Sequence, residues 1–267
     1  MNLNLENGWQ VLPIDGDTGT AYMGINKDER VFLKRNSSPF LAALSIEHIV
    51  PRLIWTRTMV SGDTLTAQEW MNGRCLAKDE MCSEDVTSLL YRVHHSELLK
   101  KMLLQIGGQI VTPYELLNRY FRGLDSDLRR HPLLKSVANQ LRACQPELER
   151  SNYEVCHGDL NHKNWLMSDS EKLYLVDWES AIIADPAMDI SMLMCQYVPR
   201  NSWYQWLNQY AKGNLTEDLC ERVEWYAKLY LLLNIKNSRM RGRFHEMNQD
   251  IVKLNEFSNK KLFNGKG

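Results

Sequence analysis

The chain has 267 residues, of which 44% are hydrophobic and 24% are charged, as expected for a globular protein with a sizeable core. Its formal net charge of −1 offers no overall basic field for nucleic acid, and no apolar run is long enough to cross a bilayer. Six cysteines without a C-x-x-C pair and the lack of a signal peptide argue against a disulfide or zinc scaffold and predict a cytoplasmic protein.

The N-terminal segment predicts two short strands at residues 11–14 and 20–25, joined by Asp-Gly-Asp-Thr-Gly. The small residues Gly16, Thr18 and Gly19 would let the backbone approach phosphate groups closely. The segment departs from Gly-x-Gly-x-x-Gly, so an ordinary hairpin turn fits it equally well.

A third strand is predicted at residues 30–35, with Lys34 near its end, and a solvated edge-strand lysine is the alternative to a functional one. Thirteen residues further on, Glu47 lies where the apolar spacing of Ile46, Ile49 and Leu53 predicts a helix, although the nearby Pro51 limits that helix. Glu47 is therefore interpreted either as a partner of Lys34 or as a solvated helix residue.

The next predicted strand, residues 65–69, ends at Glu69 and runs into Trp70 and Met71 before a glycine. Beyond it the sequence predicts mainly helices. Ser83 is a plausible N-cap, and helices are expected within 112–150, 186–197, 216–235 and 243–257. The prediction is an α+β protein with an N-terminal lobe at 1–72 and a helical C-terminal lobe at 73–267.

The segment Cys-His-Gly-Asp-Leu-Asn-His-Lys-Asn at 156–164 carries the most chemical information. It supplies the carboxylate of Asp159 and the amide of Asn164, and the apolar run at 173–176 then leads to the carboxylate of Asp177. A polar turn between the two predicted strands would bring Asp177 back beside Asn164. One carboxylate to orient a hydroxyl and two oxygen ligands for Mg²⁺ are what phosphoryl transfer from a nucleotide requires.

These residues resemble the catalytic and metal loops of the aminoglycoside phosphotransferase and choline kinase superfamily. The resemblance implies a bilobal protein-kinase-like fold, with a small antiparallel-sheet N-lobe and a larger helical C-lobe, and an ATP- and Mg²⁺-dependent kinase. It makes Asp159 the catalytic base, His157 a residue that braces its loop, and Asn164 and Asp177 the metal ligands. Protein kinases carry a lysine at the position of Asn161, which favours a small-molecule kinase.

The same resemblance implies the parts of an ATP site. The turn with Gly16, Thr18 and Gly19 would cover the phosphates, and Lys34, oriented by Glu47, would hold them. Glu69, Trp70 and Met71 would form the hinge that receives the adenine, although Trp70 and Met71 fit ordinary core positions as well. Asp189, in the Asp-Pro-x-x-Asp segment at 185–189, would brace the catalytic loop or simply cap its helix.

Over most of its length the chain resembles a narrower group, the CcrZ-type cell-cycle regulator kinases of Gram-positive bacteria, in Ala-Tyr-Met-Gly at 21–24 and Asn-Trp at 164–165. This implies a sugar-like acceptor such as ribose or 2-deoxyribose, a role in control of replication initiation, and contact with a cell-division protein such as FtsZ. Two alternatives stay open: a regulatory pseudokinase-like module that binds the division machinery, and a choline- or aminoglycoside-type kinase. The dense aromatic stretch from Tyr197 to Tyr230 is either core, an acceptor wall or a binding patch.

Overall fold

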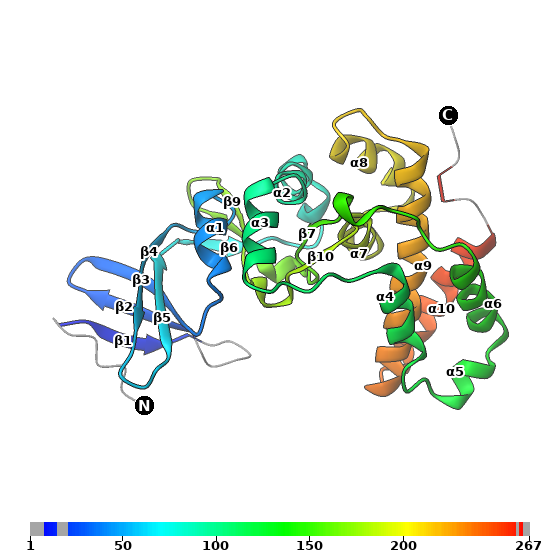
Figure 1. Ribbon diagram of the computed structural model, residues 1–267, viewed down its shortest axis with the longest axis horizontal. Coiled ribbons are helices and arrows are strands. Elements are labelled where there is room, and N and C mark those ends of the chain that lie inside the picture. The colour runs from blue at the N-terminus through cyan, green and yellow to red at the C-terminus, as the bar shows by residue number, and fades with distance from the viewer. Residues whose placement is uncertain (1–7, 15–20, 260–261, 264–267) are drawn as a thin grey trace. The chain divides into compact units, whose positions relative to one another are not determined.

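The computed structural model describes residues 8–14, 21–259 and 262–263, which form two compact units (Figure 1). The first unit draws its described residues from Met1–Leu76, Glu97–Gly107 and His162–Glu179. The second draws them from Ala77–Ser96, Gly108–Asn161 and Ser180–Gly267. The lobe boundary predicted at residue 72 stays a prediction.

A five-stranded antiparallel sheet with the order β1-β2-β3-β5-β4 forms the N-terminal part of the first unit. Its strands are β1 (Gln10–Pro13), β2 (Ala21–Asn26), β3 (Glu29–Arg35), β4 (Leu53–Thr58) and β5 (Thr64–Glu69). Val31 and Leu33 alternate along β3 and pack with Leu65 and Ala67 of β5, because alternate side chains of a strand share one face. The three strands predicted before residue 36 and the strand predicted at 65–69 are confirmed in the described residues.

The first unit also contains two helices and a second, three-stranded sheet in the order β6-β8-β9. These elements are α1 (Phe40–Ile46), α3 (Glu97–Gln105), β6 (Gly73–Cys75), β8 (Trp165–Ser168) and β9 (Leu173–Leu175). The backbone N–H of Leu175 donates to the carbonyl of Ile49 at 2.9 Å, so the β8–β9 hairpin is tied to the segment that follows α1.

The helix predicted from Ile46, Ile49 and Leu53 is wrong. Helix α1 ends at Ile46, which is exposed, and Leu53 begins β4. His48 lies between them with φ of +55°, a left-handed conformation that stops a helix. Pro51, which cannot donate a backbone hydrogen bond, follows before the strand.

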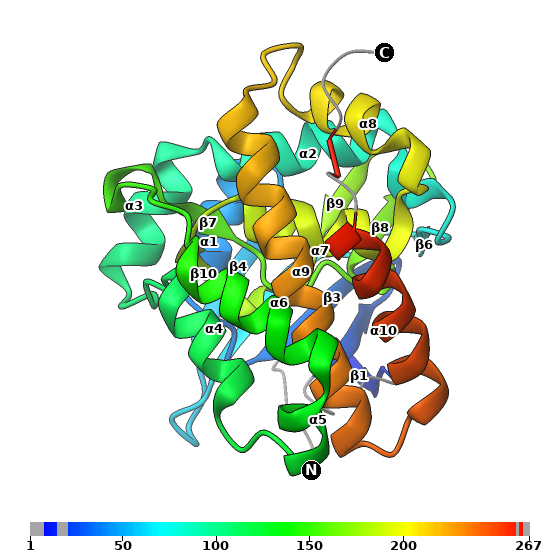
Figure 2. The same ribbon diagram turned by 90° about the vertical axis from the view of Figure 1, so that its right-hand side faces the viewer.

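The second unit is mainly helical, with one two-stranded antiparallel ladder, β7 (Glu154–Cys156) with β10 (Ile182–Ala184). Within it, α9 packs against α4, α6, α7 and α10 (Figure 2). The helices of this unit are α2 (Glu84–His94), α4 (Pro113–Phe121), α5 (Ser126–Arg130), α6 (Pro132–Ala143), α7 (Ala187–Tyr197), α8 (Trp203–Tyr210), α9 (Glu217–Met240) and α10 (Phe244–Asn259).

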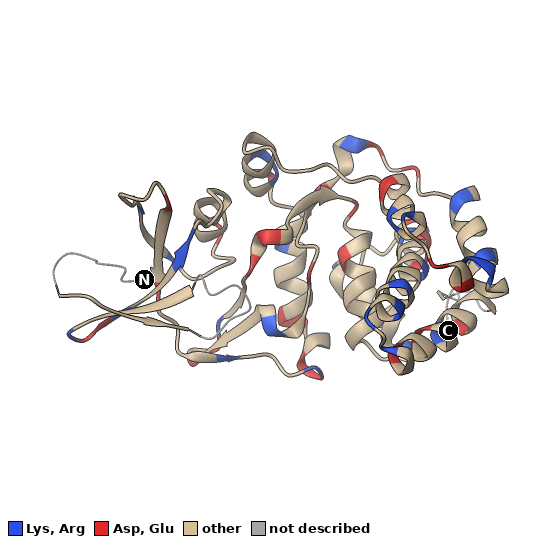
Figure 3. Ribbon diagram, turned by 90° about the horizontal axis from the view of Figure 1, so that it is seen from below, with Lys and Arg blue, Asp and Glu red and all other residues tan. Residues whose placement is uncertain are grey.

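The local signals for these helices are visible in the sequence. Thr112 and Glu115 form a reciprocal capping box at the start of α4, and Pro132 occupies the first turn of α6. The short helices α5 and α8 were not predicted. Acidic and basic residues are interspersed along the helices (Figure 3). Among the described residues, no helix combines the length and the apolar character needed to span a bilayer.

Candidate active site

The loop after β7, in the second unit, is held by the side chains of α7. The backbone N–H groups of His157 and Gly158 donate to the two carboxylate oxygens of Asp189, at 2.6 and 3.0 Å. The N–H of Leu160 donates to the sulfur of Met192 at 3.5 Å. Three backbone donors of this short loop therefore end on one helix, and Asp189 braces the loop as the resemblance implied.

His157 is fully buried, and its Nδ1 accepts the backbone N–H of Asp159 at 3.2 Å. This contact closes the loop on itself and leaves the Asp159 residue exposed. A buried imidazole that accepts from the neighbouring backbone stabilises the shape of the loop. The roles predicted for His157 and Asp159 in catalysis stay predictions; His157 contacts the backbone of the loop.

Gly158 occupies a position that only glycine fits. Its φ is +78°, and an added Cβ would lie 2.7 Å from the carbonyl oxygen of Ser180. Both the left-handed backbone and the close approach exclude a side chain there. The sequence motif therefore contains Gly158 for a steric reason, in addition to the residues that it contains for their chemistry.

Asn164 and Asp177 belong to the first unit, at the open end of the β8–β9 hairpin. The N–H of Val176 donates to the carbonyl of Asn164 at 2.8 Å, one step beyond the paired residues Trp165 and Leu175. The predicted return of the chain beside Asn164 is therefore present. The chain passes from Asp159, in the second unit, to this hairpin at the Asn161–His162 bond.

Lys34 of β3 makes ion pairs with two carboxylates of the first unit. Its ammonium lies 3.2 Å from Asp177 Oδ1 and 2.8 Å from Glu179 Oε1. Burial acts to lower the pKa of Lys34, but the hydrogen bonds and charges of Glu179 and Asp177 together outweigh it and raise this pKa. Lys34 therefore stays charged throughout the physiological range.

Glu179 is a candidate site residue to which the sequence alone assigned no role. The signal was present in Asp-Trp-Glu at 177–179, where two carboxylates flank an aromatic residue. Trp178 is buried against the ring of Phe40 at 5.8 Å between centroids, and its indole donates to the carbonyl of Leu175 at 2.7 Å. This anchor fixes the segment that carries both carboxylates.

The predicted pair of Lys34 with Glu47 does not form in the structure. Glu47 follows the last residue of α1, and among the described residues the ion-pair partners of Lys34 are Asp177 and Glu179. The helix that was expected to carry Glu47 toward the sheet ends too early. A role for Glu47 in nucleotide binding stays a prediction.

The predicted hinge lies in the first unit between the two sheets. Glu69 ends β5, its N–H donates to the carbonyl of Arg52 at 2.8 Å, and Trp70 donates from Nε1 to Asn72 at 3.0 Å. Trp70 and Met71 are half-buried, so neither is a closed core position. Gly16, Thr18 and Gly19 lie outside the described residues.

The oxygen donors around Lys34 have the chemistry of a metal site. Asp177 and Glu179 direct one carboxylate oxygen each at the same ammonium, so the two groups converge on a single cation. Carboxylate and amide oxygens are the ligands that Mg²⁺ prefers. Asp177, Glu179 and the neighbouring Asn164 therefore fit a magnesium ion in their chemistry.

The aromatic stretch from Tyr197 to Tyr230 is largely core. Five of its rings are at most 6% exposed, whereas Tyr204 on the same helix as three of them is 50% exposed. The five buried residues are Trp203, Trp206, Tyr210, Trp225 and Tyr226. Helical spacing, with apolar faces turned inward, accounts for this part of the sequence.

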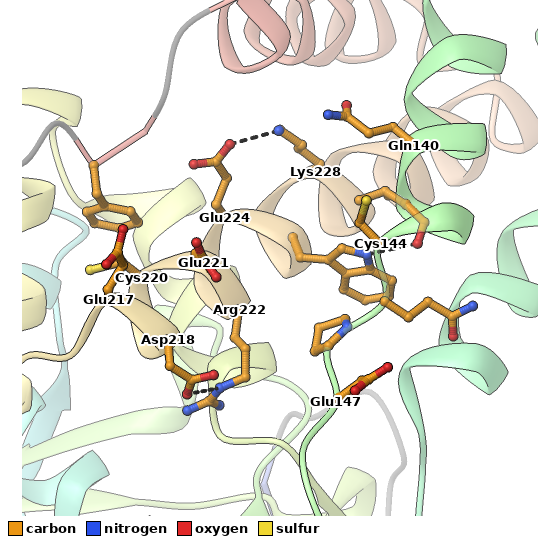
Figure 4. A pocket seen from close by; sticks show the side chains of 15 residues that line it. Gln140, Cys144, Glu147, Glu217, Asp218, Cys220, Glu221, Arg222, Glu224 and Lys228 are labelled. Atoms are coloured by element: carbon orange, nitrogen blue, oxygen red, sulfur yellow. Dashed lines mark hydrogen bonds and ion pairs between the residues drawn. The ribbon is translucent and has the colours of Figure 1, made fainter.

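A pocket of about 560 Å³ lies between α6 and α9 in the second unit (Figure 4). Its lining is rich in acidic residues, and Arg222 projects among them and contacts Asp218 at 2.9 Å. Neither His157 nor Asp159 lines it. The pocket is therefore separate from the catalytic loop.

Comparison with known proteins assigns the chain to a family. The model of the phosphotransferase enzyme family matches residues 35–226, which is most of the chain and includes the loops described above. The chain belongs to this phosphotransferase family. It has a kinase-like fold and is a kinase by family, as the sequence predicted.

Relatives of this phosphotransferase include Protein LicA of Haemophilus influenzae, which is 26% identical over 76% of this chain and 70% of that protein. A second Haemophilus influenzae protein of the same name is 24% identical, over 76% of this chain and 55% of the other protein.

Among solved structures, the choline kinase LicA from Streptococcus pneumoniae has a TM-score of 0.63 at 15% identity, covering 93% of this chain and 94% of that one. The GDP complex of an aminoglycoside 2'-phosphotransferase-IIIa has a TM-score of 0.61 at 13% identity, covering 94% and 93%. At these identities the structures support the fold alone. The narrower resemblance to the CcrZ-type kinases stays a prediction.

Proposed function

We propose that this phosphotransferase transfers the γ-phosphate of ATP to a hydroxyl group of a small acceptor. The observation that carries the proposal is the convergence of Asp177 and Glu179 on the ammonium of Lys34. Asp177 directly follows Val176, whose N–H donates to the carbonyl of Asn164. A phosphate-binding cation next to a hard oxygen donor set is what a Mg-nucleotide requires. Several of the solved relatives were crystallised with AMP or GDP, which supports a nucleotide substrate.

In this proposal Asn164 and Asp177, together with Glu179, hold Mg²⁺, which when bound neutralises charge on the phosphates. Lys34 contributes a permanent positive charge for the phosphate oxygens, since its pKa is raised. The turn with Gly16, Thr18 and Gly19 would cover the phosphates. Glu69, Trp70 and Met71 would receive the adenine, and Glu47 would lie near the phosphates.

Asp159 is proposed to orient the acceptor hydroxyl and to accept its hydrogen as the oxygen attacks the γ-phosphorus and ADP leaves. Its loop suits this task because the flanking backbone donors are fixed on α7 and His157. A carboxylate carried on a held backbone suits this reaction because positioning supplies most of the catalysis of phosphoryl transfer.

For the acceptor we propose a neutral, sugar-like molecule, with ribose or 2-deoxyribose first. The sequence resemblance to CcrZ-type kinases supports it. The second candidate is an amino alcohol such as choline, which the name of the Streptococcus pneumoniae relative favours.

The test is ADP release by the purified protein with ATP and Mg²⁺ over a panel of pentoses, nucleosides, amino alcohols and aminoglycosides. A pentose should give the highest kcat/KM, and Asp159→Ala should lose at least about 10³-fold in rate while it remains folded. Asp169→Ala, which alters an exposed turn aspartate of the β8–β9 hairpin, is the matched control. A preference for choline would replace the sugar proposal, and full activity of Asp159→Ala would remove Asp159 from its role.

The proposed link to cell division and replication initiation rests on the same resemblance. A deletion strain should be restored by the wild-type gene and not by Asp159→Ala. Restoration by the inactive variant would favour the regulatory, pseudokinase-like alternative. Direct contact with FtsZ is tested by co-sedimentation of the two purified proteins, with Asp159→Ala expected to bind as the wild type does.

A further inference from the structure

His94, the last residue of α2, connects two helices of the second unit. Its side chain is fully buried, and both ring nitrogens have partners. Nε2 lies 3.3 Å from Oδ2 of Asp189 on α7, and Nδ1 lies 2.8 Å from the hydroxyl of Tyr210 on α8. Asp189 is the residue whose carboxylate holds the N–H groups of His157 and Gly158.

The hydrogen-bond partners determine the tautomer of His94. An ionised carboxylate accepts hydrogen bonds only, so Nε2 must carry the hydrogen that faces Asp189. Tyr210 then donates to Nδ1. Among the described residues, His94 is the hydrogen-bond partner of the Tyr210 hydroxyl, so a doubly protonated His94 would leave a buried O–H without an acceptor.

The groups that face His94 support the neutral ring. Burial raises the pKa of Tyr210 well above its usual range, so its hydroxyl keeps its hydrogen. Burial likewise raises the pKa of Cys156, on β7, so that this neighbour is a neutral thiol. Directly after α2, His95 stacks on Tyr91 of that helix. Within the described part of the chain, the carboxylate in hydrogen-bond contact with the ring is that of Asp189.

We propose that Tyr210 is a positioning residue for the catalytic loop: it keeps His94 in the neutral tautomer whose Nε2–H is directed at Asp189. The proposal rests on the proposed function, because the loop that Asp189 holds carries Asp159. It assigns a role to α8, a helix that the sequence did not predict. The hydroxyl of Tyr210, on α8, thereby sets the tautomer of His94. Through His94 it orients the Asp189 carboxylate that holds the loop.

Tyr210→Phe removes the donor and leaves Nδ1 able to take a proton. We expect kcat to fall about tenfold, because the ring can then carry its hydrogen on either nitrogen and no longer holds a fixed Nε2–H toward Asp189. KM for ATP should stay within about twofold, since the residues proposed to bind ATP belong to the first unit. Tyr204→Phe is the matched control: it makes the same change on α8 at an exposed residue and should leave both constants unchanged.

Nitrogen-15 spectra of histidine-labelled protein test the tautomer without any phosphoryl transfer. The His94 signal is the one that disappears in His94→Gln, whose amide retains a donor for Asp189. In the wild type it should be that of a neutral Nε2–H ring, and in Tyr210→Phe the Nε2–H form should give way to a mixture of ring forms. A charged or Nδ1–H ring in the wild type overturns the proposal even if Tyr210→Phe does not fold.

Two further outcomes separate this proposal from other readings. An equal kcat in Tyr210→Phe and the wild type would overturn the proposal about Tyr210 and leave the kinase proposal intact. If the wild type phosphorylates no acceptor, the proposed function fails while the spectra still decide the tautomer. His94, Cys156 and Asp189 have ligand atoms within 4.8 Å of one another, so stoichiometric zinc bound through Nε2 would also contradict the assigned tautomer.

Discussion

Asp177 combines an unusual backbone with a candidate metal ligand. Its φ is +66°, a left-handed conformation that few residues other than glycine adopt and that aspartate and asparagine tolerate best. Such positions are concentrated at functional sites, where surrounding contacts hold them. Here Trp178, buried against Phe40, and the bond from Val176 to Asn164 hold the segment on both sides.

Asp177→Asn should abolish most activity without unfolding the protein. Asparagine accepts the same backbone conformation, but it lacks the charge that a metal ion and Lys34 require, so a loss of at least about 10²-fold in kcat is expected. Steady-state ADP release and circular dichroism measure the two effects. Asp169→Asn makes the same chemical change on an exposed turn and should be neutral. Activity of Asp177→Asn close to wild type would contradict the metal assignment.

Gly158→Ala should destabilise the protein more than Gly213→Ala does. Both glycines have φ near +80°, so alanine incurs the same left-handed cost of about 1–2 kcal/mol at each. Only at Gly158 would the new methyl group meet an atom, the carbonyl of Ser180 at 2.7 Å. Urea unfolding gives the loss in free energy of unfolding for each variant. The difference between the two losses reports the contact with Ser180 alone. Equal losses would show that the loop moves freely to make room.

At the scale of elements, the end of β3 is tied to the turn between β4 and β5. Asn36 and Thr64 exchange hydrogen bonds, and the carboxylate of Asp63 accepts from Asn36 at 3.0 Å and from Ser61 at 2.8 Å. Arg35 pairs with the same carboxylate. Because Lys34 precedes these residues, the network helps to fix the place of the candidate phosphate-binding ammonium.

This network predicts an acid-sensitive sheet. Hydrogen bonds from Asn36 and Ser61, together with Arg35, lower the pKa of Asp63 from 3.8 to about 2. A lowered pKa in the folded state means that the stabilisation is complete above pH 3.8 and is lost as the pH falls through about 2. The unfolding midpoint of the wild type should exceed that of Asp63→Asn at pH 7, and the difference should shrink toward pH 2. Asp28→Asn, in the exposed turn after β2, serves as the control; a constant difference would contradict the assignment.

At the scale of the whole molecule, each unit is assembled from three separate chain segments. The first unit requires β8 and β9 because β8 pairs with β6 and Leu175 bonds to Ile49. A fragment of residues 1–107 lacks both strands and should not reach the fold of this unit. A well-dispersed two-dimensional NMR spectrum of that fragment would contradict this expectation.

Nucleotide binding should stabilise the intact chain by mass action. With ATP and Mg²⁺ at about 100 times Kd, the gain is about 2.7 kcal/mol, equivalent to a rise in Tm of roughly 5–10 °C. Asp159→Ala should show the same rise, because Asp159 is proposed to contact the acceptor and not the nucleotide. Lys34→Met should show a smaller rise. Thermal unfolding with and without ATP and Mg²⁺ measures all three, and a full rise in Lys34→Met would remove Lys34 from the phosphate site.

Most of the strands, helices and candidate residues were predicted from local patterns. Alternation predicted β3 and β5, prolines and caps predicted the starts of α4 and α6, and the spacing of Asp159, Asn164 and Asp177 predicted the kind of chemistry. The failures lie where tertiary contacts prevail over local pattern. The spacing of Ile46, Ile49 and Leu53 fits a helix, yet a left-handed residue and a following strand end that helix early.

The sequence by itself indicated the family and the kinase-like fold through the resemblance of its motifs to known kinases. Its apolar runs and the polar turn between them predicted the hairpin that returns the chain beside Asn164, because such a hairpin depends on local pattern. Only the tertiary structure decided that Lys34 pairs with Asp177 and Glu179, and that His94 contacts the Asp189 carboxylate that holds the loop after β7. These contacts join residues about 95 to 145 positions apart. Long-range pairs form through packing and charge in three dimensions, and no local pattern specifies which of several competing carboxylates meets a given ammonium.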